Sequence, residues 1–155
     1  MWWLLPAGVV LVCDQATKWL ALAYLEPGWP VAVVPGLNWY LTFNRGIAFS
    51  AFASPGDWQR WVFSAVAAGV ALIVMVVLWR DHRKPDLAGW ALVLILGGAL
   101  GNLIDRLRFG VVVDFIDCYL GPWHWPAFNI ADSAISVGAV LLVIAMLREG
   151  RSQKT

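Results

Sequence analysis

Four long apolar stretches, separated by more polar segments, dominate the sequence. A helix needs about 20 mostly apolar residues to cross the hydrocarbon core of a membrane. The stretches lie at about residues 2–24, 58–79, 87–104 and 130–147. The third is shorter than the others, and the fourth begins with polar residues before it becomes apolar. The pattern predicts four transmembrane helices in a single membrane domain that spans residues 1–155.

The first stretch is either a cleavable signal sequence or a retained helix. It lacks the basic start of a secretory signal, and it is longer than the apolar region of about 7–15 residues that such signals contain. It also carries Asp14, Gln15 and Lys18 among its apolar residues. We therefore expect a retained helix.

The segment between the first two helices has the pattern of β-strands. Val31–Val34 and Leu37–Phe43 are rich in residues that favour strands, and Pro35 and Gly36 between them favour a turn. A further strand is predicted through Gly46–Phe52. The expected fold class is a membrane all-α protein with a small β element, in which four transmembrane helices carry a small outward-facing β-sheet.

Composition agrees with a membrane protein. Of the 155 residues 61% are hydrophobic, and the mean hydropathy is +0.70, whereas soluble domains are about 45–50% apolar. The net charge of +1 gives no reason to expect a nucleic-acid partner. The two cysteines, Cys13 and Cys118, have no metal-ligand spacing, and we interpret them as small hydrophobic residues.

Basic residues predict the orientation in the membrane. Six of the eleven lysines and arginines lie in the loop 80–84 and in the tail 147–155. Four helices would place both segments on one side, and an excess of basic residues marks that side as cytoplasmic. Both termini are therefore expected inside, with residues 25–57 and 105–129 outside.

Ionisable groups at membrane depth are costly and tend to face a bundle interior or a water-filled cavity. Asp14 and Lys18 are four residues apart, with the acid first, which suits an ion pair on one helix face. We favour a buried structural pair that orients the first helix. Asp105 and Arg106 follow the third predicted helix. Arg106 either binds a substrate carbonyl or simply lies at the membrane interface.

Asp114 and Asp132 are the strongest candidates for chemistry. Asp114 lies in an apolar extended stretch, Val111–Phe115, with no opposite charge nearby in the sequence. Asp132 has a structural explanation, because Asn129 and Asp132 have the spacing of an N-cap and a helix-stabilising acid. Two neighbouring carboxylates that share one proton can supply both a base and an acid for peptide hydrolysis. The spacing alone leaves both interpretations open.

Five segments resemble, in order, the signature blocks of bacterial lipoprotein signal peptidases (signal peptidase II). They are Asp14-Gln-Ala-Thr-Lys18, Phe43-Asn-Arg-Gly-Ile-Ala-Phe-Ser50, Gly97-Gly-Ala-Leu-Gly-Asn-Leu-Ile-Asp-Arg106, Val113-Asp-Phe115 and Phe128-Asn-Ile-Ala-Asp-Ser133. The resemblance covers residues 14 to about 138. Ile47 departs from it, since the family often has alanine there.

The resemblance implies an intramembrane aspartyl endopeptidase without a cofactor or metal. It would remove signal peptides from diacylglyceryl-modified prolipoproteins, cleaving before the lipidated cysteine. It implies catalysis by Asp114 and Asp132 at the outer face of the bacterial cytoplasmic (inner) membrane. It also implies substrate binding by Asn44, Gly46, Asn102, Arg106 and Asn129, and support from Asp14, Lys18 and Asp105. Membrane lipid and globomycin-like inhibitors are the other expected partners, and a monomer is expected.

Two other functions compete with a peptidase. A small transporter or assembly factor would distribute its acids through the bilayer, whereas here they lie near the outer ends of the helices. A membrane acyltransferase would present a nucleophile or a histidine at its site. His124 is the only outward histidine, and His82 is expected in the cytoplasmic loop.

Overall fold

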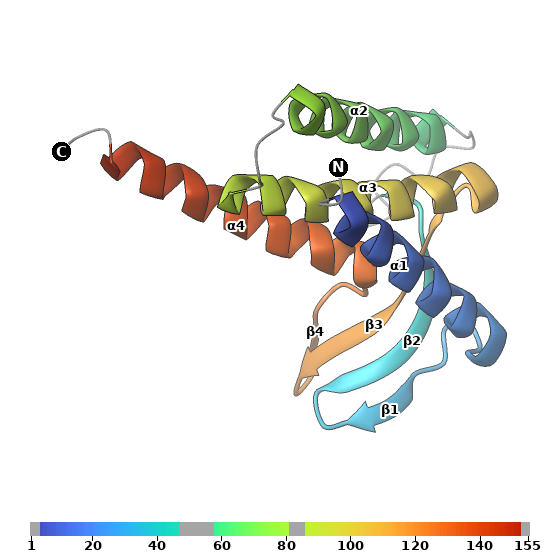
Figure 1. The fold of residues 1–155 in the computed structure, drawn as a ribbon. Helices are drawn as coiled ribbons and strands as arrows, with labels where there is room; N and C mark the ends of the chain where they lie inside the picture. The colour runs from blue at the N-terminus through green and yellow to red at the C-terminus, as the bar shows by residue number, and fades with distance from the viewer. Residues whose placement is uncertain (1–3, 47–57, 81–85, 153–155) are drawn as a thin grey trace.

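A helical bundle carries a small antiparallel sheet at one end (Figure 1). The structure is a computed structural model, and it describes residues 4–46, 58–80 and 86–152. The helices are α1 (Leu5–Tyr24), α2 (Trp58–Arg80), α3 (Leu87–Phe109) and α4 (Ile130–Ser152). The strands are β1 (Val31–Val34), β2 (Leu37–Asn44), β3 (Val112–Leu120) and β4 (Trp123–His124).

Three helices of the described part, α2, α3 and α4, are long and apolar enough to cross a membrane. Helix α1 is not among them, because Asp14, Gln15 and Lys18 lower its hydropathy. Much of the apolar surface of α2 is exposed, including Leu72 and Ile73, as expected for a helix that faces lipid. The chain is a membrane protein, and a membrane span by α1 stays a prediction.

Helix α3 extends beyond its predicted end. The prediction ended at residue 104, but the helix continues to Phe109 and stops at Gly110, whose φ of +78° is the left-handed conformation of a C-cap. Arg106 and Arg108 in the last turn suit the negative end of the helix dipole. Asp105 and Arg106 therefore belong to the helix, and the segment that joins α3 to α4 begins five residues later than predicted.

The predicted hairpin is confirmed, and it forms part of a larger sheet. Strands β1 and β2 pair antiparallel around Pro35 and Gly36, and Gly36 has a φ of +92°. The sheet order is β1-β2-β3-β4, so that β2 also pairs with β3, from Leu37 opposite Cys118 to Asn44 opposite Val112. The pairing between β2 and β3 was not predicted. The predicted strand 46–52 lies outside the described residues beyond Gly46, as does Ile47.

Glycines allow the helices to approach closely. A Cβ atom at Gly97 would lie 2.8 Å from the backbone oxygen of Ala7 in α1, and one at Gly101 would lie 2.5 Å from a carboxylate oxygen of Asp14. Gly138 in α4 faces α3 in the same way, 2.7 Å from the backbone oxygen of Ala91. Real Cβ atoms are not found this close to other atoms, so glycine is required for the observed packing. The small-residue spacing of Gly97 and Gly101 is therefore an α1–α3 contact surface.

Candidate active site

The ammonium group of Lys18 lies between two carboxylates from different helices. Its Nζ atom is 2.9 Å from Asp14 Oδ2, one turn earlier in α1, and 2.9 Å from Asp105 Oδ2 in α3. All three side chains are almost completely buried. Removing Lys18 would leave two buried carboxylates without their cation, which is costly. The predicted pair of Asp14 and Lys18 is confirmed, and Asp105 joins α3 to it.

Both acids also bind the backbone of the elements that carry Asp114 and Asp132. The backbone N–H of Ala131, in the first turn of α4, donates to Asp14 Oδ1 at 2.9 Å. The backbone N–H of Val113, in β3, donates to Asp105 Oδ2 at 3.0 Å. The charged cluster therefore sets the position of the start of α4 and of the start of β3.

Gln15 is part of this cluster and was not singled out from the sequence. Its Nε2 atom donates to Asp105 Oδ1 at 2.9 Å and to Asp14 Oδ2 at 3.2 Å. The available signal was an amide directly after a buried acid in an apolar helix. The amide satisfies Asp105 Oδ1, which the ammonium group leaves free, and shares Asp14 Oδ2 with that group.

Two asparagine amides connect Lys18 with the candidate catalytic acids. Lys18 Nζ donates to Asn102 Oδ1 at 3.1 Å, and Asn102 Nδ2 donates to Asp132 Oδ1 at 2.7 Å. Asn129 Nδ2 donates to Asp114 Oδ1 at 2.7 Å and lies 3.2 Å from Asn102 Oδ1. Because lysine only donates, it holds the amide oxygen of Asn102 and thereby directs the NH2 group to Asp132.

Asp114 and Asp132 reach this network from different elements. Asp114 is 1% exposed on β3, and Asp132 is partly buried in the first turn of α4. Asn129 Oδ1 accepts from the backbone N–H of Asp132 at 2.8 Å, which confirms Asn129 as the N-cap of α4. The same Asn129 side chain binds Asp114. One residue thus caps the helix that carries one acid and holds the carboxylate of the other.

Burial raises the pKa of Asp114 from 3.8 to about 7, and the negative charge of Asp132 acts in the same direction. Hydrogen bonds with Asn44 and Asn129 and the positive charge of Lys18 act against this rise in the pKa but do not cancel it. A carboxyl group with this pKa is protonated in a large fraction of molecules at neutral pH. The arrangement can therefore hold one proton beside a second carboxylate.

Asn44, Gly46 and Arg106 border the acid pair. The backbone N–H of Gly46 donates to Asn44 Oδ1 at 2.7 Å. Gly46 has a φ of +89°, and a Cβ atom there would lie 2.5 Å from Cδ2 of Phe63, so that only glycine fits between this turn and α2. The guanidinium of Arg106 lies over the Phe63 ring, 5.8 Å from its centroid, and Nη1 is 3.4 Å from the backbone oxygen of Asn102.

The structure brings all of the residues predicted for the site to one region, where α1, α3 and α4 meet β2 and β3. They are Asp14, Lys18, Asn44, Gly46, Asn102, Asp105, Arg106, Asp114, Asn129 and Asp132. In the described part of the chain no group of three or more His, Cys, Asp or Glu residues is placed to hold a metal ion. The absence of a metal stays a prediction.

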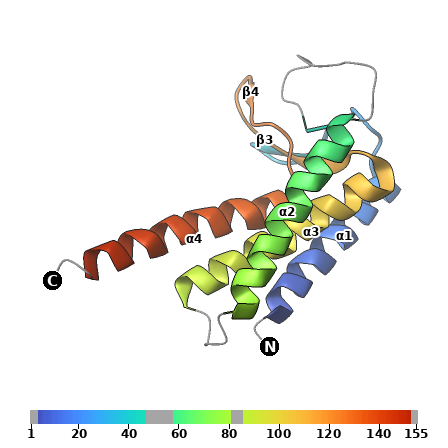
Figure 2. The same ribbon diagram turned by 90° about the horizontal axis from the view of Figure 1, so that it is seen from above.

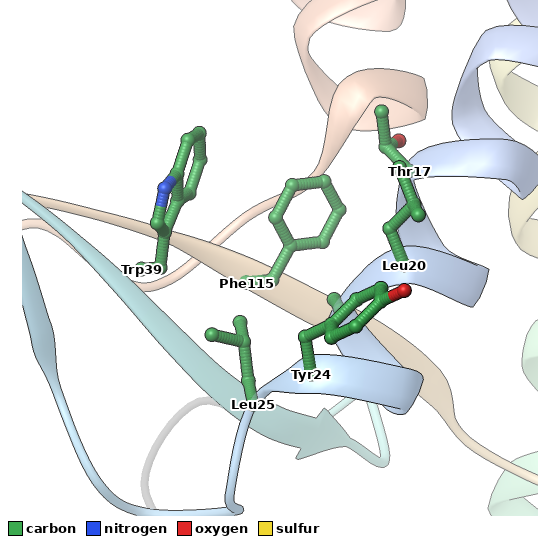
Figure 3. A pocket seen from close by; sticks show the side chains of 7 residues that line it. Thr17, Leu20, Tyr24, Leu25, Trp39 and Phe115 are labelled. Carbon is green, nitrogen blue, oxygen red and sulfur yellow. The ribbon is translucent and has the colours of Figure 1, made fainter.

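An apolar pocket lies between α1 and the sheet (Figure 3). Its volume is about 310 Å³, and it is lined by Thr17, Leu20, Ala21, Tyr24, Leu25, Trp39 and Phe115. Phe115 directly follows Asp114 on β3. An apolar binding space therefore lies next to the strand that carries one of the two acids.

Comparison with known proteins agrees with this geometry. The family described as signal peptidase (SPase) II matches residues 7–148. The chain belongs to the signal peptidase II family. A lipoprotein signal peptidase of Polynucleobacter necessarius is 49% identical over 143 residues, which cover 92% of this chain and 87% of that protein. A lipoprotein signal peptidase of Burkholderia mallei is 48% identical over 152 residues, which cover 98% of this chain and 91% of that protein.

Two solved structures of bacterial membrane enzymes share the fold. The first, at 2.3 Å resolution, has a TM-score of 0.82 and 31% identity, and the match covers 96% of this chain and 88% of that chain. The second, at 1.9 Å resolution, has a TM-score of 0.82 and 32% identity, and covers 94% and 92%. The signal peptidase II family is a family of peptidases, and neither the transporter nor the acyltransferase interpretation agrees with membership in it.

Replacing Lys18 by methionine should destabilise this signal peptidase II family member by about 3–5 kcal/mol, because two buried carboxylates would lose their cation. The triple variant Asp14→Asn, Lys18→Met, Asp105→Asn should regain much of that loss, since no unpaired buried charge remains. Exposed Arg108→Met is the control and should change stability by less than about 1 kcal/mol, the usual size of its interaction with the helix dipole. Unfolding of the purified variants in detergent measures the difference. Equal stability of the single and triple variants would contradict this account.

Proposed function

We propose that the protein is an intramembrane aspartyl endopeptidase that removes the signal peptide from diacylglyceryl-modified prolipoproteins, with cleavage before the lipidated cysteine. The observation that carries this proposal is the pair formed by Asp114 and Asp132, which one network of amides and one buried cation holds together. The relatives named lipoprotein signal peptidase support the choice of substrate.

In the proposed reaction the two carboxyl groups share one proton. The ionised carboxylate removes a proton from a water molecule, whose oxygen attacks the carbonyl carbon before the lipidated cysteine. The protonated carboxyl group donates its proton as the C–N bond breaks and the amine of the cysteine leaves. The products are the free signal peptide acid and the lipidated mature protein.

The surrounding residues divide into two proposed groups. The amide of Asn102 donates to Asp132, and that of Asn129 donates to Asp114. These bonds support a role for both amides in positioning the two acids, in addition to any contact with substrate.

Asn44 and Arg106 make fewer hydrogen bonds within the network. We propose that they bind the backbone of the unwound signal peptide, whose polar groups lipid cannot satisfy. Gly46 lets this turn lie against α2, and Asp14, Lys18 and Asp105 support the site. Globomycin-like inhibitors would occupy the same space.

We propose that all four helices span the bacterial inner membrane, with both termini in the cytoplasm and the site at the outer face. The sheet lies at the end of the bundle opposite the start of α1 and the end of α2 (Figure 2). In a variant with both native cysteines replaced by serine, an impermeant thiol reagent added outside should label Trp29→Cys but not Arg80→Cys. Both positions are exposed. Labelling in the reverse pattern would refute this topology.

The acid pair should act as one unit. Asp114→Asn and Asp132→Asn should each lower kcat by about 10²- to 10⁴-fold or more. The double variant should be little worse than either single one, because members of one catalytic unit are not additive. Asp86→Asn, at the cap of α3, is a matched control that keeps its capping oxygen and should keep its activity. Full activity in either single variant would refute the assignment.

Lipid attached to the substrate should raise the cleavage rate. An acyl chain seated in the membrane or in the apolar pocket beside Phe115 would hold the cysteine near the acid pair and supply orientation. Purified protein should cleave a diacylated prolipoprotein with a higher kcat than the same peptide without lipid in the same detergent. Equal rates on the two substrates would exclude this role of the lipid and would leave the acid pair unaffected.

The pH dependence follows from the raised pKa of Asp114. Below a pH of about 7 the pair keeps its shared proton, and above it both carboxyl groups ionise and the acid is lost. Activity should therefore fall as the pH rises above about 7, approaching tenfold per pH unit. The exposed acid Glu26 provides a control, since Glu26→Gln should leave the profile unchanged. Activity that is constant from about pH 6 to 9 would be inconsistent with this mechanism.

A further inference from the structure

A second polar cluster lies on the sheet, away from the acid pair. The carboxylate of Asp117, on β3, is buried and accepts a hydrogen bond from Asn38 Nδ2 on β2 at 2.8 Å. His124 Nδ1, on β4, lies 2.8 Å from one oxygen of Asp117 and 3.0 Å from the other. The mechanism above uses none of these three residues.

The geometry of His124 leaves one ring nitrogen for a ligand. The carboxylate of Asp117 accepts, so Nδ1 carries the hydrogen that joins the two side chains. The ring stacks on Tyr119 with centroids 5.2 Å apart, and about half of the side chain is exposed. Within the described part of the chain Nε2 has no hydrogen-bond partner. With the hydrogen on Nδ1, the ring presents Nε2 as an oriented hydrogen-bond acceptor.

This acceptor borders a cavity of about 380 Å³. Its lining comes from the approach to β1, from β2, β3 and β4, and from the segment that joins β4 to α4. The lining residues are Pro30, Tyr40, Asp117, His124, Trp125 and Ala127. The cavity combines apolar walls with hydrogen-bonding groups, as sites for peptides and small molecules commonly do.

The charge at this cavity selects the kind of ligand. Among the residues that line the cavity, Asp117 is the acid, and no lysine or arginine is among them. A phosphate or a carboxylate would therefore meet repulsion from Asp117. A ligand with N–H donors and small apolar side chains fits better, and an extended peptide has both.

The position of the cavity relates it to the acid pair. Asp117 follows Asp114 by three residues on β3, a distance of about 10 Å along a strand. An extended peptide that is cleaved at the acid pair covers the same distance in about three residues beyond the cut bond. We propose that this cavity binds the mature part of the substrate near its third or fourth residue, with a backbone N–H donating to His124 Nε2. This inference rests on the proposed function.

Substrates of graded length test it. Diacylated substrates with the same signal peptide would carry one, two, four or six residues after the lipidated cysteine. The wild-type protein should show a KM about three- to tenfold lower for the four-residue tail, which contains both the third and the fourth mature residue, than for the one-residue tail, which contains neither. This is the effect of one additional hydrogen bond. The kcat should stay nearly constant, because such binding is the same in the ground state and the transition state.

Two variants identify the cavity as the cause. His124→Asn keeps a donor toward Asp117 but loses the acceptor at Nε2, and it should remove the dependence of KM on tail length. Ala127→Phe fills the cavity without changing the pair of Asp117 and His124, and it should have the same effect even if His124→Asn folds poorly. Leu120→Ala, on the same hairpin but outside this cavity, is the control and should keep the full dependence.

Each other outcome overturns the inference. A wild-type KM that does not change with tail length excludes a tail site. If the two variants keep the dependence of KM on tail length, the tail binds elsewhere. An equal loss on short and long tails indicates a role in folding or a lipid headgroup site instead. Failure of the wild-type protein to cleave any of these substrates refutes the proposed function itself, whereas cleavage without tail dependence refutes only this inference.

Discussion

The buried ammonium group of Lys18 is the interaction on which the rest of the site depends. One cation faces Asp14 and Asp105 in a buried region, and an acid that moved away would leave its own buried charge without a cation. The same two acids accept backbone hydrogen bonds from the start of α4 and the start of β3. Because the ion pairs keep both acids in place, the acids in turn fix the positions of α4 and β3, which bear the candidate catalytic acids.

Close packing of the helices makes this cluster possible. Distances of 2.9 Å between side chains on α1 and α3 require the two backbones to lie near each other, and Gly97 and Gly101 provide the space. In a membrane, burial of apolar surface gives little drive for helices to associate. The way in which the helices pack together therefore depends more on steric fit at glycines and on satisfied polar groups than it would in a soluble core.

The sheet extends the site beyond the bundle. Strand β3 presents Asp114 to the helices at one end and Asp117 to the hairpin at the other. Two separate amides, Asn129 and Asn38, hold these two carboxylates, so that each is oriented by a residue of a neighbouring element. The strand thus connects the proposed place of cleavage with the cavity that Asp117 and His124 border.

Local signals in the sequence determined the helices, the hairpin around Gly36, the i, i+4 pair of Asp14 and Lys18, and the N-cap at Asn129. Each of these depends on residues a few positions apart, where periodicity and turn preference act directly. The tertiary structure decided the pairing of β2 with β3, the use of Asn102 and Asn129 as bridges, and the pair of Asp117 and His124. The pairing of β2 with β3 and the two asparagine bridges join segments whose separation in the chain carries no information about their distance in space. Asp117 and His124 are only seven residues apart, but they meet across the turn between β3 and β4, a hairpin that was not predicted. These contacts form because buried charges and amides must find partners once the glycine surfaces have brought the helices together.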